Sequence, residues 1–397
     1  MISVSQTVKL LVQNRPNRDI EDVDLNAALG LQCAVNLIAK LSMPPFDASA
    51  MDGYAVKLSD AKSGTRLTVS GEAPAGSPSE GDVSNGEAVR IFTGGQIPAG
   101  AETVVIQENV TRSDGAILIN ESQDRIHYVR KAGMDFLKGD VLVPKGRIMG
   151  PADITLAASG NNSAVKIYRT LKVAILASGN ELKPPGSELK PGEIIGSNSL
   201  GLAAMVRNWG ADLVDLGIVA DNLSAIVERI ETAKQADIVV PIGGASVGDY
   251  DYMRAAFKAA GFRILFDKVA VKPGKPTWFA AKGKQRVLGL PGNPASASVC
   301  AHLFLKPLLG LCETVHLVDA VLGNDISANG PRETYLRGRL SLHSLQLRAE
   351  SFPRQDSSLI TPLAEANALI QLPSNAGPWA AGDIIKVMHL GVGPSIF

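Results

Sequence analysis

Apolar residues in the first part of the chain recur at spacings of three and four positions. Over residues 4–12, and again over residues 25–38, this spacing predicts amphipathic helices. The pattern ends at Met43, because a residue that precedes a proline is disfavoured in the α-helical conformation. We therefore predict a helical segment over residues 1–45 and a further helix over residues 151–159.

Between positions 54 and 129 the pattern changes to short runs in which apolar and polar residues alternate. Alternation of this kind is typical of strands with one buried face. The runs lie at residues 66–69, 88–92, 103–106 and 116–119. Ser113-Asp114-Gly115 separates two such runs and fits a hairpin turn. We predict a β domain over residues 46–136, inserted into a helical and linker domain made of residues 1–45 and 137–170.

From Leu171 onwards, apolar strands alternate with amphipathic helices, which predicts right-handed βαβ units around a parallel sheet. The expected strands are residues 172–176, 211–219, 237–242, 269–271 and 286–290. The helices are expected to begin at Ser197 or Asn198, at Asp221 or Asn222, and at Asn293 with Pro294 in the first helical position. These elements form an α/β domain over residues 171–315.

Strand-like alternation returns in the last part of the chain, at residues 335–347, 359–372 and 384–388. We therefore expect a C-terminal β domain over residues 316–397. The fold class is α/β plus β, in a multidomain chain.

Composition narrows the function classes. The chain has 397 residues, 45% of them apolar, and its 39 basic and 39 acidic residues give a net charge of zero. No overall positive field attracts nucleic acid or an anionic membrane. The three cysteines form no C-x-x-C pair, and the five histidines lack the spacing of a zinc site. We expect a reduced, cytoplasmic protein without nucleic-acid or membrane partners.

Polar and glycine-rich residues follow nearly every predicted strand of the α/β domain. Since ligands bind at the carboxyl ends of the strands in an open parallel sheet, these residues are expected to share one edge. They are Ser178, Glu181, Asp221, Gly243, Gly244, Ser246, Asp249, Asp251, Lys272, Lys275, Pro291, Asn293 and Pro294.

Glycine turns and a helix that begins at Pro294 favour an anion at this edge, because both present backbone N–H groups to it. The acids would repel that anion by roughly 4 kcal/mol per charge pair at ~4 Å and an effective dielectric near ~20. A bridging Mg²⁺ would remove this conflict. In the alternative interpretation, Asp221 and Asn293 are helix N-caps and Lys275 is a solvated turn residue.

A serine hydrolase is the enzymatic alternative. Residues 244–248 match the G-x-S-x-G pattern of a nucleophile elbow, with Ser246 as the nucleophile. Such an enzyme needs a later acid and then a histidine at strand ends, whereas His302 lies within a predicted helix. The nucleotide-binding patterns G-x-x-x-x-G-K-[ST] and G-x-G-x-x-G after a strand are missing.

Several motifs together resemble the molybdopterin molybdenumtransferase family of the MoeA type, which includes the gephyrin E domain. The first is Pro44-Pro45-Phe46-Asp47-Ala48-Ser49-Ala50-Met51-Asp52-Gly53-Tyr54-Ala55. The others follow in the family's order: Thr93-Gly94, Ser178-Gly179-Asn180-Glu181-Leu182, residues 243–252, Lys272-Pro273-Gly274-Lys275-Pro276 and Leu290-Pro291-Gly292-Asn293-Pro294. The resemblance covers essentially the whole chain.

The resemblance implies an elongated subunit with a three-layer α/β domain like the molybdopterin-binding fold, an inserted β domain and a C-terminal β barrel. It implies a homodimer with its active cleft between the α/β domain of one subunit and the β domain of the other. The implied reaction is Mg²⁺-dependent insertion of molybdate into adenylylated molybdopterin, with release of AMP. Other molybdenum cofactor biosynthesis proteins are implied as partners. A gephyrin-like scaffold without activity is the non-enzymatic alternative.

The family's functional residues match positions of this chain. Catalytic roles are implied for Asp52, Glu181, Asp221 and Asp251, and metal binding for Asp249, Asp251 and Glu181. Substrate binding is implied for Thr93, Asp135, Ser178, Gly243, Gly244, Ser246, Lys268, Lys272, Lys275, Pro291, Asn293, Pro294, Arg332 and Ser357. Of these, Asp52, Thr93 and Asp135 would come from the partner subunit.

Overall fold

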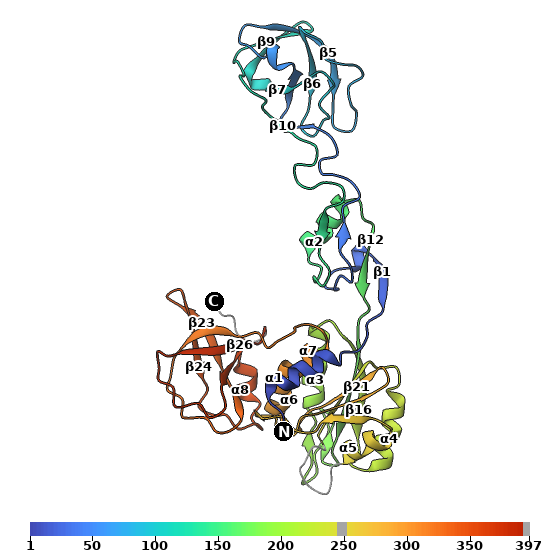
Figure 1. Cartoon of the computed structure of the whole chain (residues 1–397), viewed down its shortest axis with the longest axis vertical. Helices are drawn as coiled ribbons and strands as arrows, with labels where there is room; N and C mark the ends of the chain where they lie inside the picture. Colours follow the sequence, from blue (N-terminus) through green and yellow to red (C-terminus); the bar gives the residue numbers. More distant parts are fainter. Residues whose placement is uncertain (244–251, 392–397) are drawn as a thin grey trace. The chain divides into compact units, whose positions relative to one another are not determined.

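The computed structural model describes residues 1–243 and 252–391. The chain forms two compact units (Figure 1). The first comprises Met1–Asp19 and Thr170–Phe397, and the second comprises Ile20–Arg169. Each unit has its own buried apolar clusters.

The second unit contains the predicted β domain. Its six-stranded sheet has the order β7–β4–β6–β5–β9–β8. These strands are β4 (Gly53–Val56), β5 (Arg66–Ala73), β6 (Glu87–Ile91), β7 (Thr103–Ile106), β8 (Val110–Ser113) and β9 (Ala116–Ile119), with short 3₁₀ turns η2 (Leu58–Asp60) and η3 (Gln107–Asn109). The predicted hairpin is confirmed, since β8 and β9 pair antiparallel around Gly115 at φ 71°.

In the rest of the second unit, only one of the two predicted helices forms. Helix α2 (Pro151–Ser159) forms as predicted. The helix predicted over residues 25–38 is wrong, because η1 (Leu25–Ala27) is a single 3₁₀ turn and Gly30 at φ 78° interrupts it. The apolar residues instead pack among paired short strands: β1 (Ile20–Asp24) with β12 (Ala164–Tyr168), β2 (Leu37–Ile38) with β11 (Val141–Val143), and β3 (Ala48–Ser49) with β10 (Val129–Arg130).

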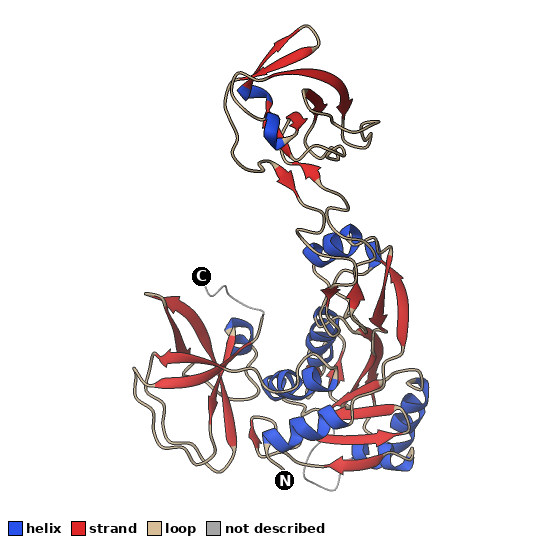
Figure 2. Cartoon of the chain, turned by 45° about the horizontal axis from the view of Figure 1, so that its top comes forward, coloured by secondary structure: helices blue, strands red, loops and turns tan. Residues whose placement is uncertain are grey.

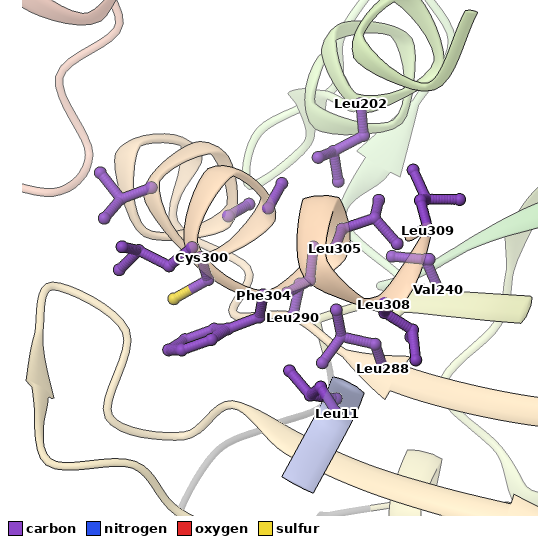
Figure 3. Close-up of a cluster of buried hydrophobic side chains, with 14 of the residues drawn as sticks. Leu11, Leu202, Val240, Leu288, Leu290, Cys300, Phe304, Leu305, Leu308 and Leu309 are labelled. Atoms are coloured by element: carbon purple, nitrogen blue, oxygen red, sulfur yellow. The ribbon is translucent and has the colours of Figure 1, made fainter. Parts of the chain in front are cut away.

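Helix α1 (Val4–Gln13) forms as predicted but packs in the first unit. Ser3 caps it by accepting a hydrogen bond from the backbone N–H of Gln6. Leu11 is buried beside residues of the α/β domain, in the cluster shown in Figure 3. The segment predicted as residues 1–45 is therefore divided between the two units, and the remaining domain boundaries stay predictions.

The α/β domain is built on a six-stranded sheet between two helical layers. The order β16–β13–β17–β21–β20–β18 combines β13 (Lys172–Ser178), β16 (Asp212–Val219), β17 (Ile238–Ile242), β18 (Arg263–Phe266), β20 (Trp278–Lys282) and β21 (Gln285–Gly289). Along β13, Val173 and Ile175 face the cluster with α1 and α3 (Asn198–Asn208), whereas Ala174 and Leu176 face the cluster with α4 (Leu223–Thr232) and α5 (Tyr252–Ala259). The same three layers are seen in Figure 2.

The helices follow the predicted starts. Ser197 precedes α3, Asn222 caps α4, and Pro294 is the first residue of α6 (Pro294–Cys300). Helix α6 continues as the π-helical turn η4 (Ala301–Leu305) and then α7 (Lys306–Leu308). A small two-stranded pair, β14 (Leu182–Lys183) with β15 (Ile194–Ile195), lies between β13 and α3 in the sequence.

The prediction of an all-parallel sheet is wrong at one side. Strands β16, β13, β17 and β21 are parallel, but β20 is antiparallel to β21 and to β18. Gly283, at φ 52°, makes the β20–β21 hairpin possible. The strand predicted at residues 269–271 is not part of this sheet, because β19 (Val271–Lys272) pairs with β23 (Glu333–His343) of the next domain.

The C-terminal domain is a closed five-stranded barrel. Its strands are β22 (Val318–Leu322), β23, β24 (Gln346–Ser351), β25 (Ala368–Leu372) and β26 (Ile384–His389), and the pairing of β25 with β23 closes the ring. The strand predicted over residues 359–372 begins late, since α8 (Thr361–Glu365) occupies its first half. No helix among the described residues is both long and apolar enough to cross a membrane.

Candidate active site

The carboxyl ends of the parallel strands surround a cavity of about 830 Å³. Ser178 ends β13 and Glu181 follows it, Asp221 follows β16, and Gly243 follows β17; all four line the cavity. The loop after β21 adds residues 291–294. The structure thus brings four of the predicted loops together, as expected for an open sheet.

Glycine allows these loops to approach one another closely. A Cβ atom on Gly243 would lie 2.8 Å from the carbonyl oxygen of Ser178, and φ at Gly243 is 87°. A Cβ atom on Gly292 would lie 3.6 Å from Gly243 Cα. The N–H of Gly243 donates to the carbonyl oxygen of Leu290 at 3.3 Å. A side chain at position 243 would therefore separate β17 from β13 at the cavity floor.

Ser178 is placed as predicted, at the end of β13 and against the cavity. It is 5% exposed, and its hydroxyl has no hydrogen-bond partner within residues 1–243 and 252–391. A buried hydroxyl without a partner is unusual, because its desolvation is not compensated. Ser178 is thus suited to bond a polar ligand group.

Two residues with carboxylate side chains line the cavity and have no side-chain partner in the described part of the chain. Neither Glu181 nor Asp221 has a side-chain hydrogen bond or ion pair with residues 1–243 or 252–391. The Glu181 carboxylate lies over Gly179, where a Cβ atom would be 2.8 Å from both of its oxygens. The backbone N–H of Asp221 donates to Asn180 Oδ1 at 3.1 Å, which ties the two loops together.

The N-cap interpretation of Asp221 is wrong. Asn222 is the N-cap of α4, and its Oδ1 accepts a hydrogen bond from the backbone N–H of Ala225 at 2.8 Å. The carboxylate of Asp221 is therefore not used to hold the helix, and it lines the cavity instead.

The start of α6 is partly covered by a loop of the barrel domain. Asn293 Nδ2 donates to Ser357 Oγ at 2.7 Å, and the backbone N–H of Ala295 donates to the Ser357 carbonyl oxygen at 3.0 Å. Asn293 stands at the N-cap position, but within the described residues its side chain makes no cap bond and instead bonds the barrel loop, so the N-cap interpretation of this side chain is wrong. One N–H group of the helix start is occupied by protein, which weakens the predicted anion site there. Ser357 was predicted as a ligand contact, and Ser358 and Ile360 beside it line the cavity.

The sequence analysis missed Arg337, which holds this barrel loop. Arg337 is 1% exposed. It donates to the carbonyl oxygens of Asp356 at 2.8 Å and of Leu359 at 3.0 Å. A charged residue at an inward-facing position of the alternating strand was the available signal. Arg332, which was predicted instead, donates to the Val271 carbonyl oxygen at 3.3 Å and is not among the lining residues.

The predicted lysines lie on a loop that reaches the cavity through Pro276. The side chains of Lys272 and Lys275 are exposed, and Lys268 is half-buried. The backbone carbonyl of Lys275 accepts a hydrogen bond from Val269 N–H at 3.0 Å, which closes the loop. None of the three lysines is among the described lining residues, whose charged members are both acidic.

Comparison with known proteins identifies the family. Residues 2–160 match the MoeA N-terminal region (domain I and II), residues 174–310 a probable molybdopterin binding domain, and residues 319–390 the MoeA C-terminal region (domain IV). A molybdopterin molybdenumtransferase of Haemophilus influenzae is 33% identical, with 98% of each chain covered. One of Nostoc is 34% identical over 99% of this chain and 94% of the relative. The chain belongs to the molybdopterin molybdenumtransferase family.

Solved structures agree with this membership. A crystal structure of the molybdopterin biosynthesis MoeA protein from Pyrococcus horikoshii matches with a TM-score of 0.82 at 27% identity, covering 98% of this chain and 99% of that one. The resemblance proposed from the motifs is confirmed, and neither the serine hydrolase nor the scaffold is favoured.

Two of the family's motif residues in the second unit lie side by side. Asp52 Oδ1 accepts hydrogen bonds from both the backbone N–H and the hydroxyl of Thr93, each at 2.8 Å. These two bonds lower the pKa of Asp52 below its ordinary value. Asp135, the third residue predicted there, is exposed, and its backbone N–H donates to the Met43 carbonyl oxygen at 3.0 Å.

Four predicted site residues, Gly244, Ser246, Asp249 and Asp251, lie outside the described residues. Within the described ranges, no three His, Cys, Asp or Glu side chains gather in a metal-binding group. The histidine that a hydrolase would need is also misplaced. His302 is 6% exposed, and its ring packs edge-on against Trp209 at a centroid distance of 5.2 Å.

Proposed function

We propose that this chain inserts molybdate into adenylylated molybdopterin and releases AMP, with the help of Mg²⁺. The observation that carries the proposal is the cavity at the sheet edge, in which the Glu181 and Asp221 carboxylates have no partner among the described residues. Both substrates are anions, so acids at this place call for a cation. Family membership supports the same reaction.

The donor set fits Mg²⁺ in a substrate-assisted site. Mg²⁺ is usually held by one or two carboxylates together with substrate phosphates, rather than by a complete protein cage. A cavity lined by the two carboxylates of Glu181 and Asp221 can supply such ligands. Glu181 would hold the ion, together with Asp249 and Asp251 of the segment outside the described residues. When bound, Mg²⁺ would neutralise charge on the adenylate phosphate.

The chain's own residues bind and orient the reactants. We assign the hydroxyl of Ser178 to a polar substrate group, because it is buried at the cavity and has no partner in the described part of the chain. Lys268, Lys272 and Lys275 would supply positive charge for molybdate, from a loop that meets the cavity at Pro276. The rate enhancement then comes from positioning and electrostatics rather than from a covalent intermediate.

A homodimer completes the proposal. Among residues 1–243 and 252–391, more than half of the large apolar side chains that stay exposed belong to the second unit. They include Leu29, Met43, Met51, Ile126, Tyr128, Met134, Leu137, Val141 and Ile148. We infer that part of this exposed apolar surface is covered by a second copy of the chain. Asp52, Thr93 and Asp135 would then serve the cavity of the partner subunit.

The test is AMP release from adenylylated molybdopterin by the purified chain, measured by chromatography with and without molybdate and Mg²⁺. Release that requires both, and that is lost in Asp251→Ala, is the expected result. Turnover of a simple ester that is lost in Ser246→Ala would instead indicate a hydrolase. A folded protein with neither activity would indicate a scaffold. Light scattering at twice the chain mass checks the dimer.

A further inference from the structure

The loop that carries Lys272 and Lys275 packs tightly against helix α6. At its centre, Gly274 has φ 121°, a conformation that side-chain-bearing residues rarely adopt. A Cβ atom there would overlap Cys300 Sγ and would lie 3.3 Å from Val271 Cγ1. The backbone of the loop is thus seated directly on the thiol of Cys300.

Thr277 bonds the same loop from its other end. Its side chain is completely buried, and its hydroxyl donates to the Gly274 carbonyl oxygen at 2.8 Å. The Thr277 Oγ1 atom is also 3.2 Å from Cys300 Sγ. The backbone N–H of Thr277 donates to the same carbonyl at 3.1 Å. Gly274, Thr277 and Cys300 therefore form one interlocked contact.

This contact joins two walls of the cavity. Cys300 is the last residue of α6, whose first turn contributes Pro294 and Ser296 to the lining. Pro276, between Gly274 and Thr277, lines the same cavity. Figure 3 shows Cys300 among the buried side chains of the α6 region. Burial raises the pKa of the Cys300 thiol to about 12, so the group packs as a neutral side chain and is no nucleophile.

We propose that Thr277 and Cys300 are positioning residues that set the place of the lysine loop relative to α6 and thereby tune the affinity for the oxyanion. The inference rests on the proposed function, in which Lys272 and Lys275 hold molybdate. Neither positioning residue touches the reactants. A small shift of the loop would move both ammonium groups together and weaken the binding of molybdate more than the turnover of bound substrate.

The experiment compares Thr277→Val, which removes the hydroxyl at nearly constant volume, with Thr277→Ser, which keeps it. In AMP-release assays at varied molybdate, Thr277→Val is expected to raise the KM for molybdate about fivefold, as the loss of one hydrogen bond implies. Its kcat should stay within about twofold of the wild type. Thr277→Ser should restore the KM to within about twofold. Calorimetric titration with molybdate alone should show the same shift in Kd.

Two further variants serve as a second test of the contact and as a control. Cys300→Val replaces the Sγ atom that lies against Gly274 by a methyl group and adds a second methyl group. It should raise the KM in the same direction, and it replaces Thr277→Val if that variant fails to fold. Cys312→Ala is the matched control, because it removes a partly buried thiol that lies elsewhere. The backbone carbonyl of Cys312 accepts a hydrogen bond from Arg15 and not from the lysine loop. It should leave both constants unchanged.

The outcomes separate this inference from the proposed function. A wild type without molybdate-dependent AMP release overturns the function. If the wild type is active and Lys275→Ala raises the KM for molybdate while Thr277→Val and Cys300→Val leave it unchanged, the positioning role is wrong. A loss of kcat without any change in KM or in Kd would also overturn it, because it would indicate general damage to the fold.

Discussion

The acids of the two units are held in opposite ways. In the inserted β domain, Asp52 receives two hydrogen bonds from Thr93 at 2.8 Å each, and they lower its pKa. In the α/β domain, the Glu181 and Asp221 carboxylates have no such donor among the described residues. An acid whose lone pairs are already bonded is oriented and stays ionised. An acid with free lone pairs can accept a cation.

The difference follows from where each acid lies. Asp52 and Thr93 stand on loops next to the antiparallel strands β4 and β6, so their side chains and backbone can pair across a short distance. Glu181 and Asp221 follow parallel strands, whose carboxyl ends open into a cavity. We infer that the first acid is a fixed contact and that the other two exchange partners during the reaction. Three predictions test this contrast, and a fourth measures the pH dependence of folding that its interpretation needs.

The largest effect on the rate of AMP release is expected for Glu181→Gln, which removes the negative charge of the side chain and keeps its shape. Loss of a charged contact of about 3 kcal/mol corresponds to roughly 100-fold slower AMP release. The Mg²⁺ concentration for half-maximal activity should rise as well, as measured by titration of Mg²⁺ in the same assay. Glu188→Gln, at an exposed glutamate between β14 and β15, is the matched control and should behave as wild type. Equal activity of the two variants would remove Glu181 from the site.

The next prediction distinguishes the roles of Asp221 and Asn222, which are adjacent at the start of α4. Asp221→Asn should lower AMP release about tenfold and leave stability unchanged, because Asn222 and not Asp221 caps α4. Asn222→Ala should do the reverse and lower the free energy of unfolding by about 1 kcal/mol. Urea unfolding and activity measured on both variants check this. A stability loss in Asp221→Asn would restore its role as a structural acid.

A smaller, coupled effect is expected at Asp52. Removing the charged contact in Asp52→Asn should lower activity about tenfold, and Thr93→Val about fivefold. Because both changes weaken the same Asp52–Thr93 contact, the losses should not multiply in the double variant. The measurement is kcat and KM for all three proteins. Multiplied losses in the double variant would show that the two residues act independently.

The smallest effect on activity is expected at His302, a buried group that does not line the cavity. Burial, with a lesser contribution from Lys306, lowers the pKa of His302 from 6.5 to about 3. Below pH 6.5 the unfolded chain therefore binds a proton that the folded chain does not. Stability should fall as the pH drops from 6.5 towards 3, by at most about 1.4 kcal/mol per pH unit for one proton.

Replacement by Phe, which keeps the edge-on contact with Trp209, should flatten this slope in urea unfolding at several pH values. That measurement gives the pH dependence of folding, which must be known before an acid limb of activity is assigned to Asp52. An unchanged slope in His302→Phe would assign the dependence to other groups.

Much of the local structure was predictable from residue patterns. Alternating apolar and polar residues predicted β7 and β9. Proline and glycine residues predicted α2 and the β8–β9 hairpin. Asn293 followed by Pro294 predicted the start of α6. The polar residues after β13, β16 and β21 were correctly expected at one cavity. These features depend on backbone preferences within a few residues, which is the range over which sequence alone decides conformation.

The tertiary structure decided which segments meet. The pattern at residues 269–271 predicts a strand but not its partner, and β19 pairs with the barrel strand β23 instead of the α/β sheet. Ser357 reaches α6 only because the buried Arg337 holds its loop, and the contact of Gly274 with Cys300 joins residues far apart in the chain. Sequence alone determined the types of elements and the chemistry of their loops. The pairing of distant elements depends on shape and burial across the whole domain, so only the folded chain settled it.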